Sequence, residues 1–311
     1  MKSAVRDPEM TKSGEIGQAY AFEWLEAAPD LAPYLNSFYI LRVGAERVAD
    51  TMPAYSGQLM ITLRGEASMT FEARRTVSAG AAGFMCPLTR AHQFELSPGT
   101  IIVGASLNFR GWASLTRLAV DENQDCYLPV ERGLPLPLVC RAQELPKRFA
   151  REEVTEREAL EVLVEVVRSG ISPLPMRHSQ VIDTTLEWIS SSLKPDIEIL
   201  RERLCYSERQ MQRLVARFFG QPPVRLIRRY RAIRSATLLS MPDLSAALEQ
   251  EVFDAFYDQA HMIKEIRHFT GRTPKRLQPR AASIITETLA EPGYGSVDLF
   301  GGHEQVRREK S

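Results

Sequence analysis

The sequence predicts an α+β protein, with a β-rich, barrel-like N-terminal domain followed by an all-α domain that holds two helix-turn-helix motifs. Two observations lead to this prediction. Residues 35–110 contain short β-branched or aromatic runs separated by glycine, proline and serine, which is typical of closely spaced strands. From residue 196 onward, apolar residues recur instead at spacings of three and four, which is typical of amphipathic helices. With 311 residues, the chain is long enough for two domains.

Residues 1–33 are predicted to be an N-terminal leader. A polar start is followed by QAYAFEWLEAA, residues 18–28, which is predicted to form a short helix that ends at Pro29. The N-terminus lacks the apolar stretch of a signal peptide, and no uncharged run reaches the roughly 18 residues needed to cross a bilayer. We therefore expect a cytoplasmic protein with no membrane partner.

The predicted β-rich domain spans residues 34–130. After its strands, GWASLTRLAV at residues 111–120 is predicted to form a helix that lies on the sheet. The strand region holds one histidine, His92, whereas metal-dependent cupins bring two or three histidines and a carboxylate together. His92 is therefore expected to be a packed or surface residue and not a metal ligand.

The sequence offers no arrangement that indicates an enzyme. It shows no Ser-His-Asp or G-x-S-x-G pattern and no glycine-rich phosphate loop. Its four cysteines have no C-x-x-C spacing, so they are interpreted as reduced core or turn residues. We expect no catalytic residues, no metal site and no cofactor.

Residues 131–195 are predicted to be a helical linker, because prolines separate short helical pieces there. In REEVTEREALEVLVEVVRS, residues 151–169, one apolar stripe carries Leu160, Leu163, Val164 and Val167. Two interpretations stay open. The stripe packs inside its own chain, or it pairs two copies of the chain in a homodimer.

The first helix-turn-helix motif has a defined start and end. Ser207 and Gln210 have the spacing of a capping box, so a helix is predicted to begin at Glu208. Gly220 is expected to end this helix, and Pro222-Pro223 to start the next one. The predicted packing face consists of Met211, Leu214, Val215 and Phe218.

The helix that follows is predicted to run from Pro223 to about Ser240. Its length is roughly 27 Å at about 1.5 Å per residue, and it is interpreted as a rigid spacer between the two motifs. Its predicted buried stripe consists of Leu226, Ile227, Tyr230, Ile233 and Leu238.

The second motif repeats the pattern of the first. Asp243 or Ser245 is expected to cap its first helix, Asp258 to cap its second helix and Gly271 to end it. Its predicted packing residues are Leu244, Leu248, Val252, Met262, Ile266 and Phe269. Residues 281–311 have no clear period and are predicted to be a flexible tail.

Three strings in this region carry a family resemblance: SERQMQRL from residue 207, FGQPP from residue 219 and FYDQAHMIKEIRHFTGRTP from residue 256. In this order they resemble the DNA-binding domain of the AraC/XylS family of bacterial transcription regulators. The resemblance covers about 80 residues, 196–280. It implies a β-rich domain that senses an effector, placed before a domain that reads DNA.

Two positions depart from the family pattern. In the family, the first helix of each motif usually has an alanine followed four residues later by a glycine, and here these pairs are Arg201 with Cys205 and Glu251 with Ala255. A long charged side chain cannot fill a close helix contact. We therefore expect Arg201 and Glu251 to be exposed at a shifted helix crossing or to be paired.

The resemblance also places DNA-contacting side chains. On the first recognition helix they are Arg209, Gln212, Arg213 and Arg217, and on the second they are Gln259, Ala260, His261 and Lys264. His261 has two interpretations, a supporting role near the turn or a base contact. The two helices are expected to enter adjacent major grooves of double-stranded DNA.

The charge distribution agrees with this interpretation. The chain holds 39 basic and 39 acidic residues, but residues 196–280 hold 16 and 10 of them. Between Ser207 and Arg234 there are eight arginines and one acidic residue, which produces a field that attracts phosphates. A solvated helix face is the alternative for a charge run of this kind.

The sequence thus predicts an effector-responsive, sequence-specific transcription regulator. Its predicted partners are double-stranded DNA and an unknown small-molecule effector, with RNA polymerase and a second copy of the chain as further candidates. The alternative is a ligand-binding or partner-binding protein whose helix-turn-helix domain has lost DNA binding. Arg201 and Glu251 motivate that alternative.

Overall fold

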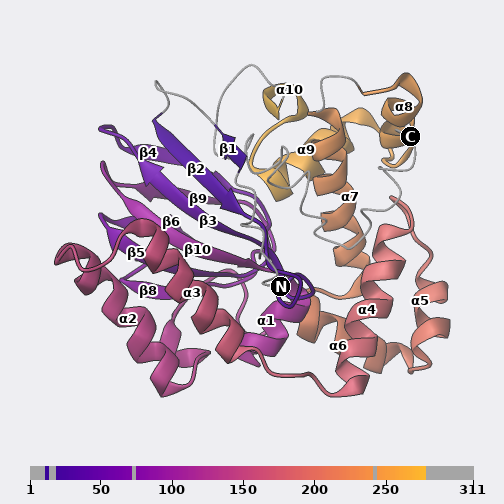
Figure 1. The fold of residues 1–311 in the computed structure, drawn as a ribbon. Helices are drawn as coiled ribbons and strands as arrows, with labels where there is room; N and C mark the ends of the chain where they lie inside the picture. The colour runs from indigo at the N-terminus through magenta and orange to yellow at the C-terminus, as the bar shows by residue number, and fades with distance from the viewer. Residues whose placement is uncertain (1–10, 14–18, 72–74, 241–243, 278–311) are drawn as a thin grey trace, which may run out of the picture.

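The computed structural model describes residues 11–13, 19–71, 75–240 and 244–277, and it confirms a β-rich domain followed by a helical one (Figure 1). The β-rich domain contains two antiparallel sheets. The larger has the strand order β1-β2-β3-β10-β5-β8-β11 and the smaller the order β4-β9-β6-β7. The strands are β1 (Thr11–Ser13), β2 (Tyr20–Leu25), β3 (Leu35–Val43), β4 (Val48–Met52), β5 (Gln58–Arg64), β6 (Ala67–Thr70), β7 (Thr76–Ser78), β8 (Ala82–Met85), β9 (His92–Leu96), β10 (Ile101–Leu107) and β11 (Tyr127–Pro129).

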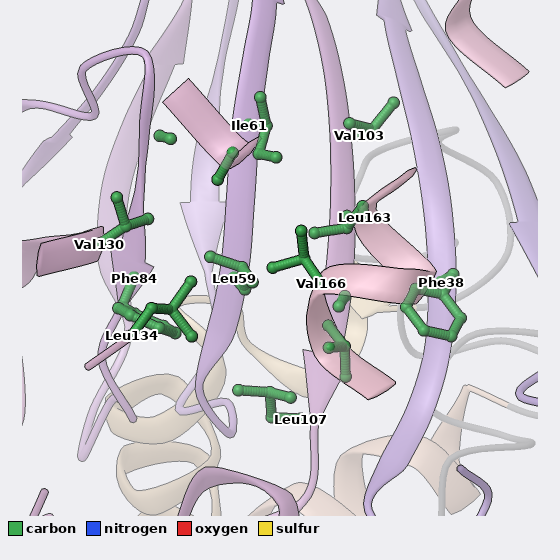
Figure 2. Packing of buried hydrophobic residues seen from close by; sticks show 14 of the residues in the cluster. Phe38, Leu59, Ile61, Phe84, Val103, Leu107, Val130, Leu134, Leu163 and Val166 are labelled. Carbon is green, nitrogen blue, oxygen red and sulfur yellow. The ribbon is translucent and has the colours of Figure 1, made fainter. Parts of the chain in front are cut away.

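The larger sheet is covered on both faces, which explains why its central strands are apolar throughout. Side chains of β3 alternate between two clusters: Phe38 and Ile40 pack with the helices, whereas Tyr39 and Leu41 face the smaller sheet. Figure 2 shows the helix-side cluster, where Leu163 and Val166 lie against residues of the central strands. The two sheets therefore form the walls of a β domain that is closed on one side by helices.

One sequence prediction for this domain is wrong. Residues 20–25 form strand β2, paired antiparallel with β3, and not part of a short helix. The reason is the period-2 placement of Tyr20, Phe22 and Trp24, which are buried while their neighbours are only partly so. The alanines, glutamates and leucine of this stretch favour a helix locally, but pairing with β3 and burial of three aromatic rings override that preference.

Helix α1 (Phe109–Thr116) follows β10 where the sequence predicts a helix, but it ends at Arg117 in the left-handed conformation and does not reach residue 120. The next elements are the short helix η2 (Val130–Arg132), α2 (Leu136–Ala150) and α3 (Glu156–Gly170). Helices α2 and α3 lie over the larger sheet (Figure 1). Among the described residues, no helix is long and apolar enough to cross a membrane.

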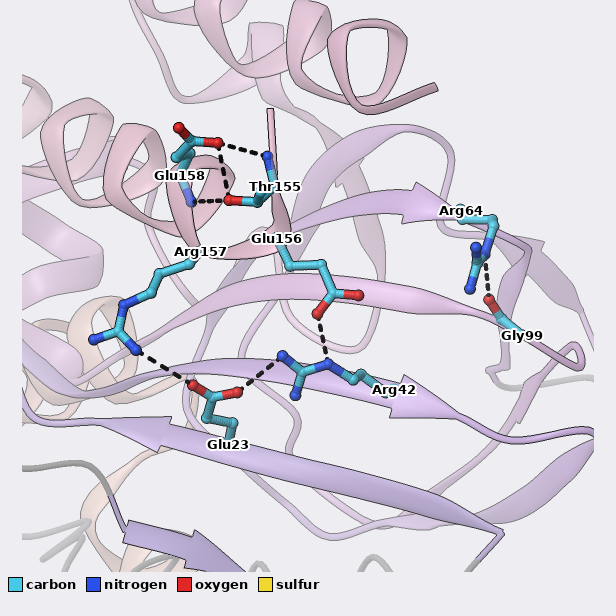
Figure 3. A network of polar contacts seen from close by, with 8 residues as sticks. All are labelled: Glu23, Arg42, Arg64, Gly99, Thr155, Glu156, Arg157 and Glu158. Carbon is cyan, nitrogen blue, oxygen red and sulfur yellow. Dashed lines mark hydrogen bonds and ion pairs between the residues drawn. The ribbon is translucent and has the colours of Figure 1, made fainter. Parts of the chain in front are cut away.

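The start of α3 is tied to the sheet by polar contacts (Figure 3). Thr155 and Glu158 form a capping box, and Glu156 accepts from Arg42 Nε at 2.5 Å. Behind this start, the stripe Leu160, Leu163 and Val167 is buried in the chain's own core. Val164, the fourth residue of the stripe, is partly buried against the same cluster, so the stripe packs inside its own chain, as the first interpretation expects.

The helical domain contains α4 (Met176–Ser190), α5 (Ile197–Leu204), α6 (Glu208–Phe219), α7 (Pro223–Leu239), α8 (Ala246–Asp254), α9 (Gln259–Thr270) and α10 (Pro274–Leu277). Helices α5 and α6 form the first motif, and α8 and α9 the second. Their core includes Ala54, Tyr55, Phe109 and Ala113 of the β domain, so one apolar cluster joins the two domains. The predicted tail, residues 281–311, lies outside the described residues.

The predicted caps of the two motifs are confirmed. Ser207 and Gln210 form the capping box of α6, Asp258 accepts from the amide of His261 at 2.7 Å, and Ser245 caps α8. Asp243, the other candidate cap for α8, lies outside the described residues. The end of α5 differs from the family pattern in a way that has an energetic consequence. Cys205, at the position where the family usually has glycine, adopts φ +54°.

Arg201 and Glu251 are both exposed, as expected for long side chains at these positions. Arg201 also pairs with Glu198 on its own helix. Neither charge is buried between helices, so neither side chain interferes with the packing of its motif.

Replacing Cys205 by glycine should raise the free energy of unfolding by about 1 kcal/mol. A left-handed conformation costs an L-residue roughly 1–2 kcal/mol, of which glycine's greater freedom in the unfolded chain offsets a part. Urea denaturation measures the change. Cys205→Ala is the matched control, because alanine keeps the left-handed strain and should give no gain. Equal stability of the two variants would show that the strain is absent.

Candidate nucleic-acid interface

Helix α6 presents a buried and an exposed face. Met211, Val215 and Phe218 are buried in the domain core. The predicted DNA-contacting residues Arg209, Gln212, Arg213 and Arg217 are all exposed. Gln212 donates to Glu208 Oε1 at 2.9 Å, so a base contact by Gln212 would compete with this bond. The structure thus places four polar side chains where a ligand can reach them.

Helix α9 occupies the equivalent place in the second motif. Its predicted contact residues Gln259, Ala260 and Lys264 are exposed, whereas His261 is partly buried. His261 Nε2 lies 3.3 Å from Glu265 Oε1, and its ring makes an edge contact with Phe256 at 6.0 Å between centroids. These contacts favour the supporting role of His261 over a base contact.

Helix α7 has the predicted start and close to the predicted length, with 17 residues from Pro223, and it contacts helices of both motifs. Helix α9 packs along α7. The buried carboxylate of Glu265 in α9 accepts from Arg228 Nε and Arg231 Nη2, each at 2.6 Å. The two motifs therefore share a core along α7, which fixes the position of one motif relative to the other.

Some arginines in and near α7 are buried or bonded within the fold, and others face solvent. The number of arginines in the sequence does not distinguish the two groups. Arg229 is buried, donates to Phe219 O at 3.0 Å and lies 5.6 Å from the Phe109 ring centroid. Arg231 pairs with Glu265, and Arg234 bonds the Tyr230 hydroxyl. The exposed arginines between Ser207 and Arg234 are Arg209, Arg213, Arg217, Arg225 and Arg228. The cationic field that faces solvent is thus smaller than the run of eight suggests.

The β domain binds both recognition helices at their C-terminal ends. The last carbonyls of a helix lack partners within it. In α6, Arg217 O accepts from Val120 N at 2.7 Å. In α9, His268 O accepts from Ala91 N at 3.1 Å and Phe269 O from Ala54 N at 2.7 Å. The docked ends lie opposite the N-terminal turns that carry the exposed polar residues.

The glycines that end these helices sit directly against the β domain. Gly220 and Gly271 have φ of +78° and +77°. A Cβ on Gly220 would lie 2.8 Å from Gln124 and 2.9 Å from Val120, and one on Gly271 would lie 2.3 Å from Thr51. Glycine is therefore required at both places by backbone conformation and by space.

The β domain encloses a cavity of about 70 Å³ between its two sheets. Its lining is mainly aromatic and aliphatic, includes Phe22, Trp24, Met60, Phe94 and Tyr127, and contains no charged side chain. Among the described residues, Trp24 Nε1 and Tyr127 Oη are buried without a hydrogen-bond partner. Burial raises the pKa of Tyr127, so this hydroxyl stays protonated and can donate.

One segment links the cavity to the second recognition helix. In this bridging segment, residues 50–55, Met52 and Tyr55 line the cavity. Asp50 pairs with Arg272, which follows α9, and Ala54 donates to the end of α9 itself. Residues that line the cavity thus lie within two positions of Ala54, whose amide bonds the end of α9.

His92 is a packed residue, as expected. It is buried, and its Nε2 lies 2.9 Å from Asp125 Oδ1. Within the described parts of the chain, no group of three or more His, Cys, Asp or Glu side chains is arranged to hold a metal ion.

Comparison with known proteins identifies the helical domain. Residues 200–280 match a family model described as a helix-turn-helix domain, of the AraC type. The chain thus carries a C-terminal AraC-type helix-turn-helix domain, the DNA-binding domain of this class of transcription regulators, and the resemblance seen in the sequence is confirmed. No curated protein was found to match the chain.

Solved structures show a distant likeness. ToxT from Vibrio cholerae O395 is 10% identical over 77% of this chain and 95% of its own, with a TM-score of 0.42. Unsaturated fatty acid bound ToxT from V. cholerae strain SCE256 is 11% identical over 90% of this chain and 100% of its own, with a TM-score of 0.41. Fe(II)-HppE with an alternative substrate is 12% identical over 33% and 60%, with a TM-score of 0.25. These scores are too low to support a functional comparison.

Replacing Glu265 by glutamine should destabilise the domain by about 3 kcal/mol, because Arg231, whose side chain is 11% exposed, would lose its charged partner. Arg228→Ala is the matched control, since that side chain is 52% exposed and its removal should cost under about 1 kcal/mol. Chemical denaturation at neutral pH measures both. Similar losses would show that Glu265 does not hold a buried pair.

The pH dependence supplies a second readout of this pair. Burial raises the pKa of Glu265, but the hydrogen bonds and charges of Arg231 and Arg228 outweigh it and hold that pKa below its usual value. The pair therefore contributes stability above the ordinary carboxyl pKa of about 4.3, and this contribution is lost as pH falls through the lower folded pKa. The Glu265→Gln variant should therefore lose less stability than the unchanged protein as the pH falls through this range.

Proposed function

We propose that the protein is a sequence-specific transcription regulator that reads two adjacent major grooves of DNA with α6 and α9. One observation carries the proposal. The first turns of α6 and α9 expose polar side chains, and a single core centred on α7 fixes the position of one helix relative to the other. Arginine can bond guanine O6 and N7, and glutamine can bond adenine N6 and N7. Because Arg209, Gln212 and Arg213 differ from Gln259 and Lys264, one subunit reads two different half-sites.

The β cavity is the proposed effector site. Its lining without charges favours an uncharged, largely apolar molecule, and the free donors Trp24 Nε1 and Tyr127 Oη favour one that carries an acceptor oxygen. The bridging segment then transmits occupancy of the cavity to α9. This arrangement supports an effector-responsive regulator.

Selection of bound duplexes from a random-sequence pool tests the proposal. An asymmetric consensus of about two helical turns supports it. Enrichment of no sequence would overturn it and would favour the alternative, a ligand-binding or partner-binding protein whose helix-turn-helix domain no longer reads DNA.

Arg213→Ala should weaken binding to the selected duplex by about 1–3 kcal/mol and change binding to a scrambled duplex much less. The side chain is exposed, so the fold should be unaffected. Fluorescence anisotropy with both duplexes measures the two affinities. Arg225→Ala, another exposed arginine that lies on α7 and outside the recognition turns, is the control. Equal losses on both duplexes for Arg213→Ala would mean that it only contacts phosphate.

Changing the distance between the two half-sites tests whether the motifs act as one unit. Inserting about 5 base pairs turns one half-site to the opposite side of the duplex. Because α7 and α9 share a core, the motifs cannot follow this change, and affinity should fall to that of a single half-site. Unchanged affinity would show that α6 and α9 do not dock together.

A further inference from the structure

Two of the four cysteines, which are far apart in the sequence, lie opposite each other in the fold. Strands β8 and β11 pair antiparallel with Tyr127 opposite Met85, so the next pair along the register is Cys126 opposite Cys86. The backbone confirms this, because Cys86 N donates to Cys126 O at 3.0 Å. Directly opposite residues in a hydrogen-bonded antiparallel pair have Cα atoms about 5.5 Å apart, within the usual range of disulfides.

The two thiols also differ in access. The interaction between the paired thiols raises the pKa of Cys86, as burial also does, and lowers the pKa of Cys126, whose Sγ donates to Asn123 O at 3.6 Å. Cys86 is buried, whereas Cys126 is partly exposed. Cys126 is therefore the thiol that a reagent from solution can reach, with Cys86 placed behind it.

The pair lies at the base of the loop that docks on the helical domain. This docking loop, residues 86–92, donates Ala91 N to the end of α9, and its Leu88 O accepts from the buried Arg229 of α7. Asp125, next to Cys126, holds the loop by accepting from Thr89 N at 2.8 Å and by contacting His92. A covalent change at Cys126 thus acts on the residue that fixes the loop.

We propose that Cys86 and Cys126 form a reversible disulfide that loosens the docking loop from α7 and α9. The Cys126 thiolate attacks a low-molecular-weight disulfide, RSSR, and releases one thiol, RSH, leaving a mixed disulfide. Cys86 then loses its proton and attacks the Cys126 sulfur, which forms the Cys86–Cys126 bond and releases the second RSH. Two protein thiols are oxidised while one RSSR is reduced.

Formation of the bond brings the two sulfur atoms to about 2.05 Å from each other. Because Asp125 is adjacent to Cys126 and is bonded to Thr89 and His92, this movement displaces Asp125 and the loop that it holds. The pair therefore adds redox control to the proposed DNA-binding function. The chemistry itself does not depend on that function.

The chemical step is tested first, in a Cys140→Ser/Cys205→Ser background that removes the two exposed thiols. Incubation with glutathione disulfide should remove two hydrogen atoms from the intact mass, give a peptide crosslink between Cys86 and Cys126, and be reversed by dithiothreitol. Cys126→Ser in the same background should keep its mass. A stable glutathione adduct, or no reaction, in the background protein would overturn the proposal.

The consequence is tested on the same oxidised sample. Amide hydrogen exchange at Ala91 should speed up relative to the reduced protein, and the Kd for the selected duplex should rise about tenfold, a size typical of coupling between two sites. The Cys126→Ser variant should show neither effect. A complete disulfide with unchanged exchange and affinity would overturn the regulatory role. If no duplex is selected at all, the proposed function fails. The mass and the hydrogen exchange still show whether the two cysteines form a disulfide and whether that bond loosens the docking loop.

Discussion

The structure depends on the backbone amides that bond the last carbonyl groups of the two recognition helices. A helix leaves these groups unpaired, and leaving them buried and unbonded costs free energy. In α6 and α9 they are bonded by Val120, Ala91 and Ala54, all from the β domain, with Gly220 and Gly271 allowing the close approach. The β domain is thus part of the support of both helices, and it leaves their N-terminal turns exposed. Under the proposed function, an effector in the β domain would act on the DNA contacts from the opposite ends of the helices.

Much of the helical domain could be predicted from the sequence, because its signals are local. Capping residues such as Ser207 and Asp258, and glycine stops such as Gly220, act within one helical turn, and the structure has them where the spacing indicates. Strand β2 shows the opposite case. Its alanine, glutamate and leucine favour a helix, whereas Tyr20, Phe22 and Trp24 have the period of a strand. Pairing with β3, a contact between distant residues, decides the outcome.

The candidate site could be predicted only in part, since exposure depends on long-range packing. The arginines of α7 look alike in sequence, yet Arg229 is buried between Phe219 and Phe109 while Arg225 is exposed. Glu265 has no sequence signal as a buried partner. The cavity, the bridging segment and the Cys86–Cys126 pair arise from residues of different strands, so no spacing rule could find them.

The central claim is that backbone bonds from the β domain hold the ends of α6 and α9. Amide hydrogen exchange of Val120, Ala91 and Ala54 in the full chain tests it most directly. The account predicts that these loop amides exchange as slowly as the core amides of β10, since both would open only when the shared core unfolds. Exchange at the rate of an open loop, with β10 still protected, would contradict the account.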